Sequence, residues 1–239
     1  MKTYIVDVET TGSNEPHITE LAYSVVDVIL GKVWVLQDPR VKRYNPMKPI
    51  SLGSMAVSHI CDEDVSKEEP HTDFKLPDNV NYMIGHNVDF DMLAIKNTGS
   101  THKPKLICTL ALSRFLLPEL ESHKLTALLY YFQKDFAREH AKNAHSALYD
   151  VKFTELVLDG LLELAKESGH EVSSIEDLYK LSEVSRTPTR LNFGKFKGES
   201  ISELAKDFEG SKYLRWLLKQ DNLDKYLKEA CEKSLLDAK

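Results

Sequence analysis

Tyr4-Ile-Val-Asp-Val-Glu-Thr-Thr-Gly12 is the stretch on which the fold of this 239-residue chain depends, since it is apolar, carries two carboxylates and ends at a glycine. Side chains of a strand alternate between faces, so Ile5, Asp7 and Glu9 share one face and the valines between them take the other. Unpaired carboxylates are costly in a buried strand, and a cation is the usual compensation. The stretch predicts half of a metal site. The alternative is an edge strand with a solvated acidic face, and these residues alone favour neither.

The composition is that of an ordinary globular protein. With 42% hydrophobic and 28% charged residues, the chain is long enough for one sizeable core plus an appendage. No apolar run approaches the roughly 20 residues of a membrane span, and the N-terminus lacks a signal-peptide pattern, so we expect a cytoplasmic protein without a membrane partner. The cysteines are widely spaced, which argues against a disulfide framework and a zinc ribbon. They are Cys61, Cys108 and Cys231.

Charge is distributed unevenly along the chain. The formal net charge of −6 speaks against a protein that coats nucleic acid generally. Residues 1–170 hold 18 basic and 24 acidic side chains, whereas Arg186 to Lys219 holds 8 basic and 4 acidic ones. The excess acid lies where a metal could use it, and the excess base follows it.

The first part of the chain predicts a three-stranded antiparallel meander. After the opening strand, a β-rich stretch runs from Ile18 to Val35, turns at Gly31-Lys32 and ends near Asp38-Pro39. A proline-punctuated loop and one or two helical turns over Ser51–Ile60 follow.

Strands and helices then alternate, which predicts an α/β fold with a mixed sheet flanked by helices. The expected strands are Val80–Ile84 and Leu106–Cys108, and the expected helices are His86–Asn97, Leu110–Leu117, Leu125–Phe132 and Asn143–Ser168.

The C-terminal part predicts a short connection and a small α(+β) module. We place one domain over residues 1–169, a short helix at Ser173–Leu181 and a linker within residues 170–190, and the module over residues 191–239. The module begins with a strand and turn over Asn192–Gly198. Helices follow over Ile201–Lys206 and from Lys212 to the end, the latter broken near Asp221.

Two further motifs belong with the opening strand. They are Gly85-His-Asn-Val-Asp-Phe-Asp91, at a strand–helix junction, and His145-Ser-Ala-Leu-Tyr-Asp150, at the start of a long helix. With these three motifs, the chain resembles the DEDDh (DnaQ-like) family of 3′→5′ exonucleases, whose motifs are Asp-x-Glu, His-Asn-x-x-Phe-Asp and His-x-x-x-x-Asp. All are intact here and in the family's order, which makes the combination far more specific than any one motif.

The resemblance implies an RNase H-like fold with a five-stranded mixed sheet, and it implies a role for each motif residue. Asp7, Glu9, Asp91 and Asp150 would hold two divalent ions, and His145 would take a proton from the attacking water. Hard oxygen ligands suit Mg²⁺, with Mn²⁺ as a possible substitute. Two ions roughly 4 Å apart can activate the water and stabilise the leaving 3′ oxygen, so the product would be a nucleoside 5′-monophosphate.

Helix geometry bears on two of these assignments. His145 and Asp150 would lie about 140° apart on one helix, so we expect His145 on the loop before it, with Ser146 or Asn143 capping. There it could act as a mobile general base, against the alternative of an exposed capping histidine. Asp89 and Asp91 would point about 200° apart, so only one can face the metals, and the family spacing selects Asp91.

The resemblance also implies substrate contacts after the first motif. Thr10, Thr11 and Gly12 would cradle the 3′-terminal nucleotide, although a plain turn is the alternative. Family members commonly follow this glycine with a large apolar residue that wedges against the terminal base. Here Ser13 stands in that place, so we expect single strands to be favoured over paired 3′ ends.

Three more residues are candidates for substrate contact. Relatives carry a histidine at the position of Ser58, and His59 stands next to it; its alternative is a solvent-facing residue at a helix end. Asn87 could equally provide only a helix cap, and Phe90 could equally belong to the core.

Within the family, the chain is most similar to the exodeoxyribonuclease X branch. The resemblance rests on Ile107-Cys-Thr-Leu110, Phe193-Gly-Lys-Phe-Lys-Gly198 and Tyr213-Leu-Arg-Trp-Leu217. Aromatic residues mixed with cations are typical of single-strand binders, but helical spacing of the same aromatics is typical of a small core. We expect Trp216 in that core, and we expect Lys195 and Lys197 to contact substrate.

The pattern therefore predicts a metal-dependent 3′→5′ exodeoxyribonuclease whose partner is DNA with a free 3′ end. Two alternatives within the class are an RNA-trimming exoribonuclease, since RNA is not excluded, and a polymerase proofreading subunit. An alternative of another class is a non-catalytic nucleic-acid-binding module. Occupation of every catalytic position argues against that last possibility.

Overall fold

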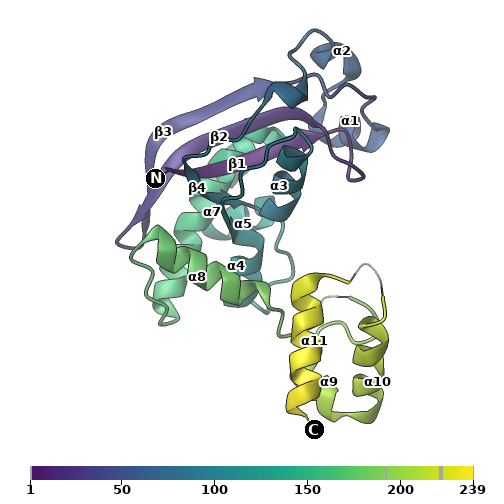
Figure 1. Cartoon of the computed structure of the whole chain (residues 1–239). Coiled ribbons are helices and arrows are strands. Elements are labelled where there is room, and N and C mark those ends of the chain that lie inside the picture. The colour runs from purple at the N-terminus through teal and green to yellow at the C-terminus, as the bar shows by residue number, and fades with distance from the viewer. Residues whose placement is uncertain (1, 192, 221–222, 239) are drawn as a thin grey trace. The chain divides into compact units, whose positions relative to one another are not determined.

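The chain forms two compact units, Met1–Ser182 and Glu183–Lys239, in a computed structural model that describes residues 2–191, 193–220 and 223–238 (Figure 1). The predicted domain limits at residues 169 and 190 stay predictions. Among the described residues, no helix combines the length and the apolar character that a membrane crossing needs.

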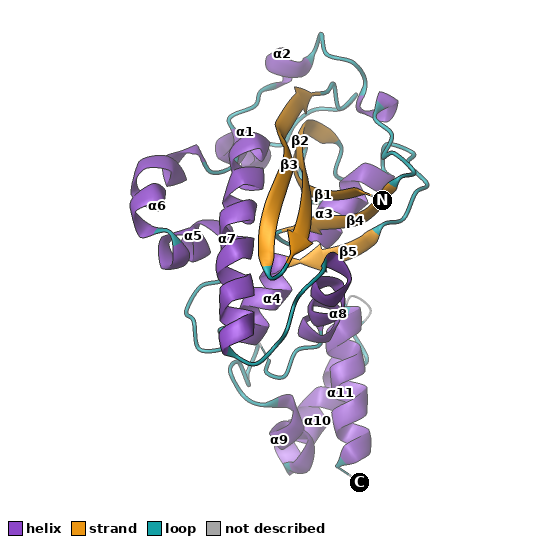
Figure 2. Ribbon diagram, turned by 90° about the vertical axis from the view of Figure 1, so that its left-hand side faces the viewer, coloured by secondary structure: helices purple, strands orange, loops and turns teal. Residues whose placement is uncertain are grey.

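A five-stranded sheet forms the centre of the first unit, in the order β3-β2-β1-β4-β5 (Figure 2). The strands β1, β2 and β3 pair antiparallel, whereas β4 is parallel to β1 and β5 is parallel to β4. The predicted mixed, helix-flanked sheet is thereby confirmed. The strands are β1 Lys2–Thr10, β2 Ile18–Ile29, β3 Lys32–Arg43, β4 Val80–Gly85 and β5 Lys105–Cys108.

The β2–β3 hairpin differs from the prediction at both ends of β3. Its turn residues are Leu30 and Gly31, both with positive φ (52° and 76°), which matches a tight two-residue hairpin turn. The strand does not stop near Asp38-Pro39 but continues to Arg43. Pro39 is tolerated because β3 is an edge strand and its register against β2 shifts there, between Tyr23 and Val25.

The alternation of β1 divides the first unit into two apolar layers. Ile5 lies in the cluster formed with α7 (Ala147–Glu167) and α5 (Leu125–Phe132). Val6 and Val8 lie in the other cluster, together with α3 (Val88–Lys96). Ile5 therefore lies on one face of β1 and the valines lie on the other, as the sequence predicts. The carboxylates of β1 share the face of Ile5, which α7 covers.

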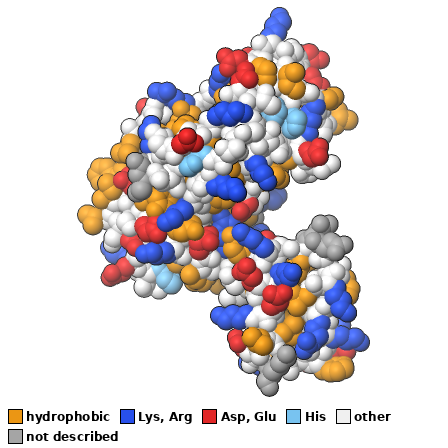
Figure 3. Space-filling model, viewed as in Figure 1, with side chains coloured by type: hydrophobic (Ala, Val, Ile, Leu, Met, Phe, Trp, Pro, Cys, Tyr) orange, Lys and Arg blue, Asp and Glu red, His pale blue; other side chains and the backbone are white. Residues whose placement is uncertain are grey.

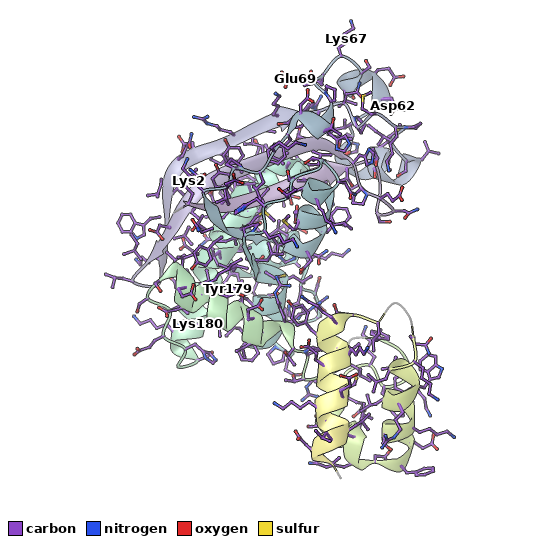
Figure 4. All side chains as sticks on the ribbon, viewed as in Figure 1. Lys2, Asp62, Lys67, Glu69, Tyr179 and Lys180 are labelled. Atoms are coloured by element: carbon purple, nitrogen blue, oxygen red, sulfur yellow. The ribbon has the colours of Figure 1, made fainter. Side chains whose placement is uncertain are left out.

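Helix α8 (Ile175–Arg186) runs farther than the predicted helix over Ser173–Leu181. Its buried apolar side chains lie in the α7 cluster. Tyr179, labelled on this helix in Figure 4, packs edge-on against Tyr82 of β4, with 6.2 Å between ring centroids. Ser174 and Asp177 exchange bonds between side chain and backbone at its start.

Two further helices of the first unit lie where helical structure was predicted, namely α1 Leu52–Ser58 and α4 Thr109–Leu116. Other short elements lie where no helix was predicted, because each is only one or two turns long. They are α2 Asp62–Val65, α6 Lys134–His140 and the 3₁₀ turns His71–Asp73 and Ala141–Asn143.

The second unit is a small helical bundle around Leu214, Leu217 and Leu227. Its helices are α9 Ile201–Lys206, α10 Phe208–Leu217 and α11 Lys225–Asp237. The predicted helix start at Lys212 was wrong, since α10 begins earlier, at the Asp207 cap. The predicted break near Asp221 and the predicted strand residue Asn192 lie outside the described residues, and residues 193–198 form turns rather than a strand.

Candidate active site

The candidate site lies at the C-terminal end of β1, where β1 extends beyond its parallel neighbour. Pairing with β4 covers only Lys2–Ile5, so Asp7 and Glu9 lie past the last paired residue. Both side chains are partly exposed. The sheet therefore supplies a rigid floor with two carboxylates at an open edge.

Asp91 takes the place that a longer β4 would have filled. It stands in the first turn of α3, is 4% exposed, and its Oδ1 accepts the backbone N–H of Val8 at 3.0 Å. Asp89 is exposed instead, as two positions along a helix require. The structure thus brings Asp91, and not Asp89, to the end of β1.

Asp150 and His145 come from the start of α7, which packs over the same face of β1. His145 precedes the helix with φ 65°, and its backbone N–H donates to Asp150 Oδ2 at 3.2 Å. Its ring is exposed, and one ligand atom each of Glu9, His145 and Asp150 lie within 4.8 Å of one another. The loop position of His145 is the one that helix geometry predicted.

Burial and mutual repulsion raise the pKa values of these carboxylates. Burial raises the pKa of Asp7 well above its usual range, and the charges of Asp91 and Asp150 raise it further. Burial and the Asp150 charge raise the pKa of Glu9 to about 8. Burial likewise raises the pKa of Asp91 to about 8, against the N–H of Val8, and that of Asp150 to about 6. Such a set needs protons or cations to be stable.

The donor set fits a hard divalent cation. Asp150 Oδ1 is buried and has no hydrogen-bond partner among the described residues, so a coordination position is available there. Carboxylate oxygens are the ligands that Mg²⁺ and Mn²⁺ prefer. A cation between β1, α3 and α7 would satisfy the acids that the fold has brought together.

Glu20 is a site residue that the sequence analysis missed. It lies opposite Glu9 in the β1–β2 register, is 7% exposed, and its charge raises the pKa of both Asp7 and Glu9. Its Oε1 accepts the backbone N–H of Ala147 at 3.2 Å, and its Oε2 accepts Nε of Arg43 at 3.2 Å. The signal in the sequence that could have identified Glu20 is its position as an acidic residue within an apolar strand.

This contact also corrects the expected cap of α7. Neither Ser146 nor Asn143 provides a side-chain cap: Ser146 is the N-cap residue but makes no side-chain cap bond. Glu20, distant in sequence, binds the first N–H of the helix instead.

The residues after the first motif form a tightly hydrogen-bonded loop. Thr10 Oγ1 donates to the carbonyl of Gly12 at 3.2 Å, and Thr11 Oγ1 accepts the N–H of His17 at 3.3 Å. A Cβ on Gly12, whose φ is 153°, would lie 3.4 Å from Ser51 Oγ. The loop is held in one shape beside the carboxylates, and its contact with substrate stays a prediction.

The other predicted substrate residues occupy different surroundings. His59 is exposed and ends α1 in the left-handed region, with φ 57°. Asn87 is exposed and precedes α3, also with positive φ, but its side chain makes no cap bond. Phe90 is partly buried against the α3 layer. Lys195 and Lys197 belong to the second unit and are exposed there.

His86 is held inside the first unit rather than at the carboxylates. Its ring nitrogens contact Thr109 Oγ1 at 3.0 Å and the His123 carbonyl at 2.9 Å. Burial lowers its pKa to about 4. It therefore links β4, α4 and the following loop.

Several curated proteins are similar in sequence to this chain. Over 180 residues the chain is 31% identical to DNA polymerase III PolC-type of Bacillus subtilis (strain 168), covering 70% of this chain and 12% of that protein. It is 26% identical over 194 residues to the 3′-5′ exonuclease DinG of the same organism, covering 73% and 20% respectively. The chain thus spans about an eighth to a fifth of the length of these relatives.

Solved structures share the fold. Exonuclease X in complex with 5′ overhanging duplex DNA matches with a TM-score of 0.54 and 26% identity, over 75% of this chain and 99% of that one. An E. coli exonuclease I–single-stranded DNA complex matches with a TM-score of 0.53 over 78% of this chain and 43% of that one, but at 20% identity it shows the fold alone.

The family described as exonuclease (RNase_T) matches residues 4–158, from the middle of β1 into α7. This span contains every carboxylate of the site and His145. The chain therefore belongs to the RNase_T exonuclease family.

Proposed function

We propose that the chain is a 3′→5′ exodeoxyribonuclease that releases nucleoside 5′-monophosphates from DNA 3′ ends by metal-dependent hydrolysis. One observation carries the proposal: Asp7, Glu9, Asp91 and Asp150 converge from three elements, and Asp150 Oδ1 is buried without a partner among the described residues. Acids that repel one another inside a fold are retained where a cation joins them.

The carboxylates would hold two Mg²⁺ ions, for which Mn²⁺ could substitute. Bound ions of this kind supply an activated water and stabilise the charge on the leaving oxygen. The chain's own contribution is geometric. Asp7 and Glu9 are fixed by the sheet, Asp91 by its bond to Val8, and Asp150 by the turn before α7.

His145 is suited to remove the proton of the attacking water. Its backbone is tied to Asp150, while its exposed ring is free to turn toward or away from the carboxylates. A general base needs to reach its proton within hydrogen-bond distance, and the ring already lies within 4.8 Å of ligand atoms of Glu9 and Asp150.

We infer that DNA is the substrate and that unpaired 3′ ends are preferred. The match to exonuclease X extends over 99% of the chain in its solved structure, which is described in complex with 5′ overhanging duplex DNA. This match supports DNA as the substrate. Ser13 is small, polar and exposed, so it offers no apolar surface to wedge against a terminal base pair. Lys195 and Lys197 are exposed cations that could contact phosphates.

Proofreading is a second candidate. It is favoured by the 31% identity to a polymerase, DNA polymerase III PolC-type. A proofreading chain would act on mismatched 3′ ends of a primer–template duplex and would bind a polymerase. Excision of a 3′ mismatch, compared with a fully paired end, distinguishes the two functions.

The test uses 5′-labelled single-stranded DNA, a blunt duplex and RNA of the same sequence, each with Mg²⁺, Mn²⁺ or EDTA. We expect a ladder of shortened products on single-stranded DNA, with metal only. Asp91→Asn should abolish the ladder, and Asp89→Asn, at its exposed neighbour on α3, should not. A metal-supplied chain that leaves every 3′ terminus intact would refute the proposal.

A further inference from the structure

The exposed face of α10 carries cations and aromatic rings together. At 100° per residue, Phe208, Lys212, Arg215 and Trp216 fall within a stripe of about 100°, which Lys219 continues past the helix end. All five side chains are exposed, and Trp216 is 53% exposed. Leu214 and Leu217 face the core on the opposite side. The expectation that Trp216 is a core residue was therefore wrong.

Trp216 is the last of a row of aromatic rings that packs against the loop before α9. The ring centroids of Phe196 and Tyr213 are 5.1 Å apart, and those of Tyr213 and Trp216 are 5.4 Å apart at an interplanar angle of 32°. The loop that carries Phe196 lies tightly on α10, since a Cβ on Gly194 would lie 2.1 Å from the Tyr213 hydroxyl. The row is therefore fixed by packing, and the ring of Trp216 at its end is exposed to solvent.

The cations around this row are free to bind an anion. Figure 3 shows Lys and Arg side chains gathered on the side of the second unit that α10 forms. Among the described residues, none forms an ion pair with Lys212, Arg215 or Lys219. Lys195 lies 4.9 Å from the Phe196 ring centroid and 3.7 Å from Glu209, in an exposed and hence weak pair.

We propose that this surface, formed by Phe196, Tyr213, Trp216, Lys212, Arg215 and Lys219, binds single-stranded DNA. A base stacks on Trp216, and the cations contact the flanking phosphates. This inference rests on the proposed function for its substrate, but not on the catalytic carboxylates. A protein partner is the weaker alternative, because the centres of protein interfaces are depleted in lysine.

The test exploits the fact that the chain has two tryptophans, Trp34 and Trp216, both exposed. In the 239-residue chain with Trp34→Phe, Trp216 is the one remaining tryptophan, and titration with oligo(dT) in EDTA measures binding through its fluorescence without hydrolysis. We expect saturable quenching of this fluorescence. Absence of quenching at saturating DNA would overturn the proposal.

Binding of labelled oligo(dT), followed by anisotropy, gives the energetic test. Trp216→Ala should weaken binding about 5- to 140-fold, the effect of one lost base stack, whereas Trp34→Ala should leave it unchanged. Lys212→Gln with Lys219→Gln should lower the salt slope by about 1.4, and Lys228→Gln on α11 should not. Equal affinities for Trp216→Ala and Trp34→Ala would refute the proposal.

These readouts separate failure of this inference from failure of the proposed function. If the chain binds oligo(dT) through Trp216 but cleaves nothing, the binding surface is supported and the exonuclease proposal is refuted. If the chain degrades DNA but Trp216→Ala binds oligo(dT) as tightly as the unaltered protein, the exonuclease proposal is supported and the binding surface is refuted.

Discussion

At the scale of single residues, Glu20 connects the start of α7 to the sheet. Its carboxylate joins Arg43 of β3 to the N–H of Ala147, two residues after His145. We therefore predict that it is a positioning residue, which would act on hydrolysis through the proposed roles of His145 and Asp150. Outer-shell partners of this kind typically change metal affinity or activity 10- to 100-fold.

We predict that Glu20→Ala lowers kcat about 10- to 100-fold and raises the Mg²⁺ concentration needed for half-maximal rate. The reason is that the N–H of Ala147 loses its acceptor and Asp150 shifts from its position. Glu20→Gln can still accept that N–H, so it should retain most of the rate. Measurement of kcat against Mg²⁺ concentration checks this, and identical behaviour of Glu20→Ala and Glu20→Gln would contradict it.

His145 can be tested without altering its unusual backbone. Its φ of 65° is tolerated by asparagine better than by alanine. We expect His145→Asn to keep the melting temperature and Mn²⁺ binding while losing about 10²- to 10⁴-fold in kcat. Single-turnover rates and Mn²⁺ titrations provide the measurement, and a rate within a few-fold of the unaltered protein would exclude the base role.

The residues that meet at the site were predictable, but one of their supports was not. Asp7, Glu9, Asp91, His145 and Asp150 follow from short motifs, each readable within a few positions. Glu20 depends on the register that sets it opposite Glu9, and on a contact with Ala147 across 127 positions. No local pattern encodes such a contact.

At the scale of elements, the same limit applies to α10. The spacing of Tyr213, Trp216 and Leu217 is compatible with a buried stripe, which led to the wrong placement of Trp216. The helix begins at Phe208, and its buried line runs through Gly210, Leu214 and Leu217 instead. The start of the helix and the packing of its neighbours, rather than spacing alone, decide which side faces the core.

Two glycines of the loop before α9 offer a matched test of how that loop supports α10. Gly194 and Gly198 both have positive φ (76° and 90°), but only Gly194 is close to Tyr213. Alanine should cost about 1–2 kcal/mol at either position for the backbone alone. At Gly194 we expect an additional loss of unfolding free energy and weaker oligo(dT) binding, measured by urea denaturation and anisotropy. Equal effects at both glycines would contradict the close packing.

At the scale of the whole molecule, the two units have separate cores, so their contributions to function can be separated. A chain that ends at Arg186 keeps α8 complete. We predict that it hydrolyses very short oligonucleotides at the normal rate but binds long single strands more weakly, with a flatter salt dependence, because the exposed cations of the second unit are lost. Anisotropy between about 50 and 200 mM salt tests this, and an unchanged salt slope would reject it.

The acids of the site make the stability of the metal-free molecule depend on pH. Burial raises the pKa of Glu9 and Asp91 to about 8, whereas in the unfolded chain such groups titrate near 4. Between these values the folded state binds more protons, so its stability falls as pH rises.

In EDTA, we therefore expect a melting temperature several degrees lower at pH 8 than at pH 5.5. Mg²⁺ should raise the melting temperature more at pH 8, where the carboxylates are charged and bind it. Glu9→Gln with Asp91→Asn is the control: it should reduce both the pH dependence in EDTA and the Mg²⁺ effect, since neither amide binds or releases a proton. Asp7 and Asp150, whose pKa values are also raised, account for the remainder. If this double variant retained the full pH dependence, the acids at the end of β1 would not be its source, and the case for a cation between them would lose its energetic basis.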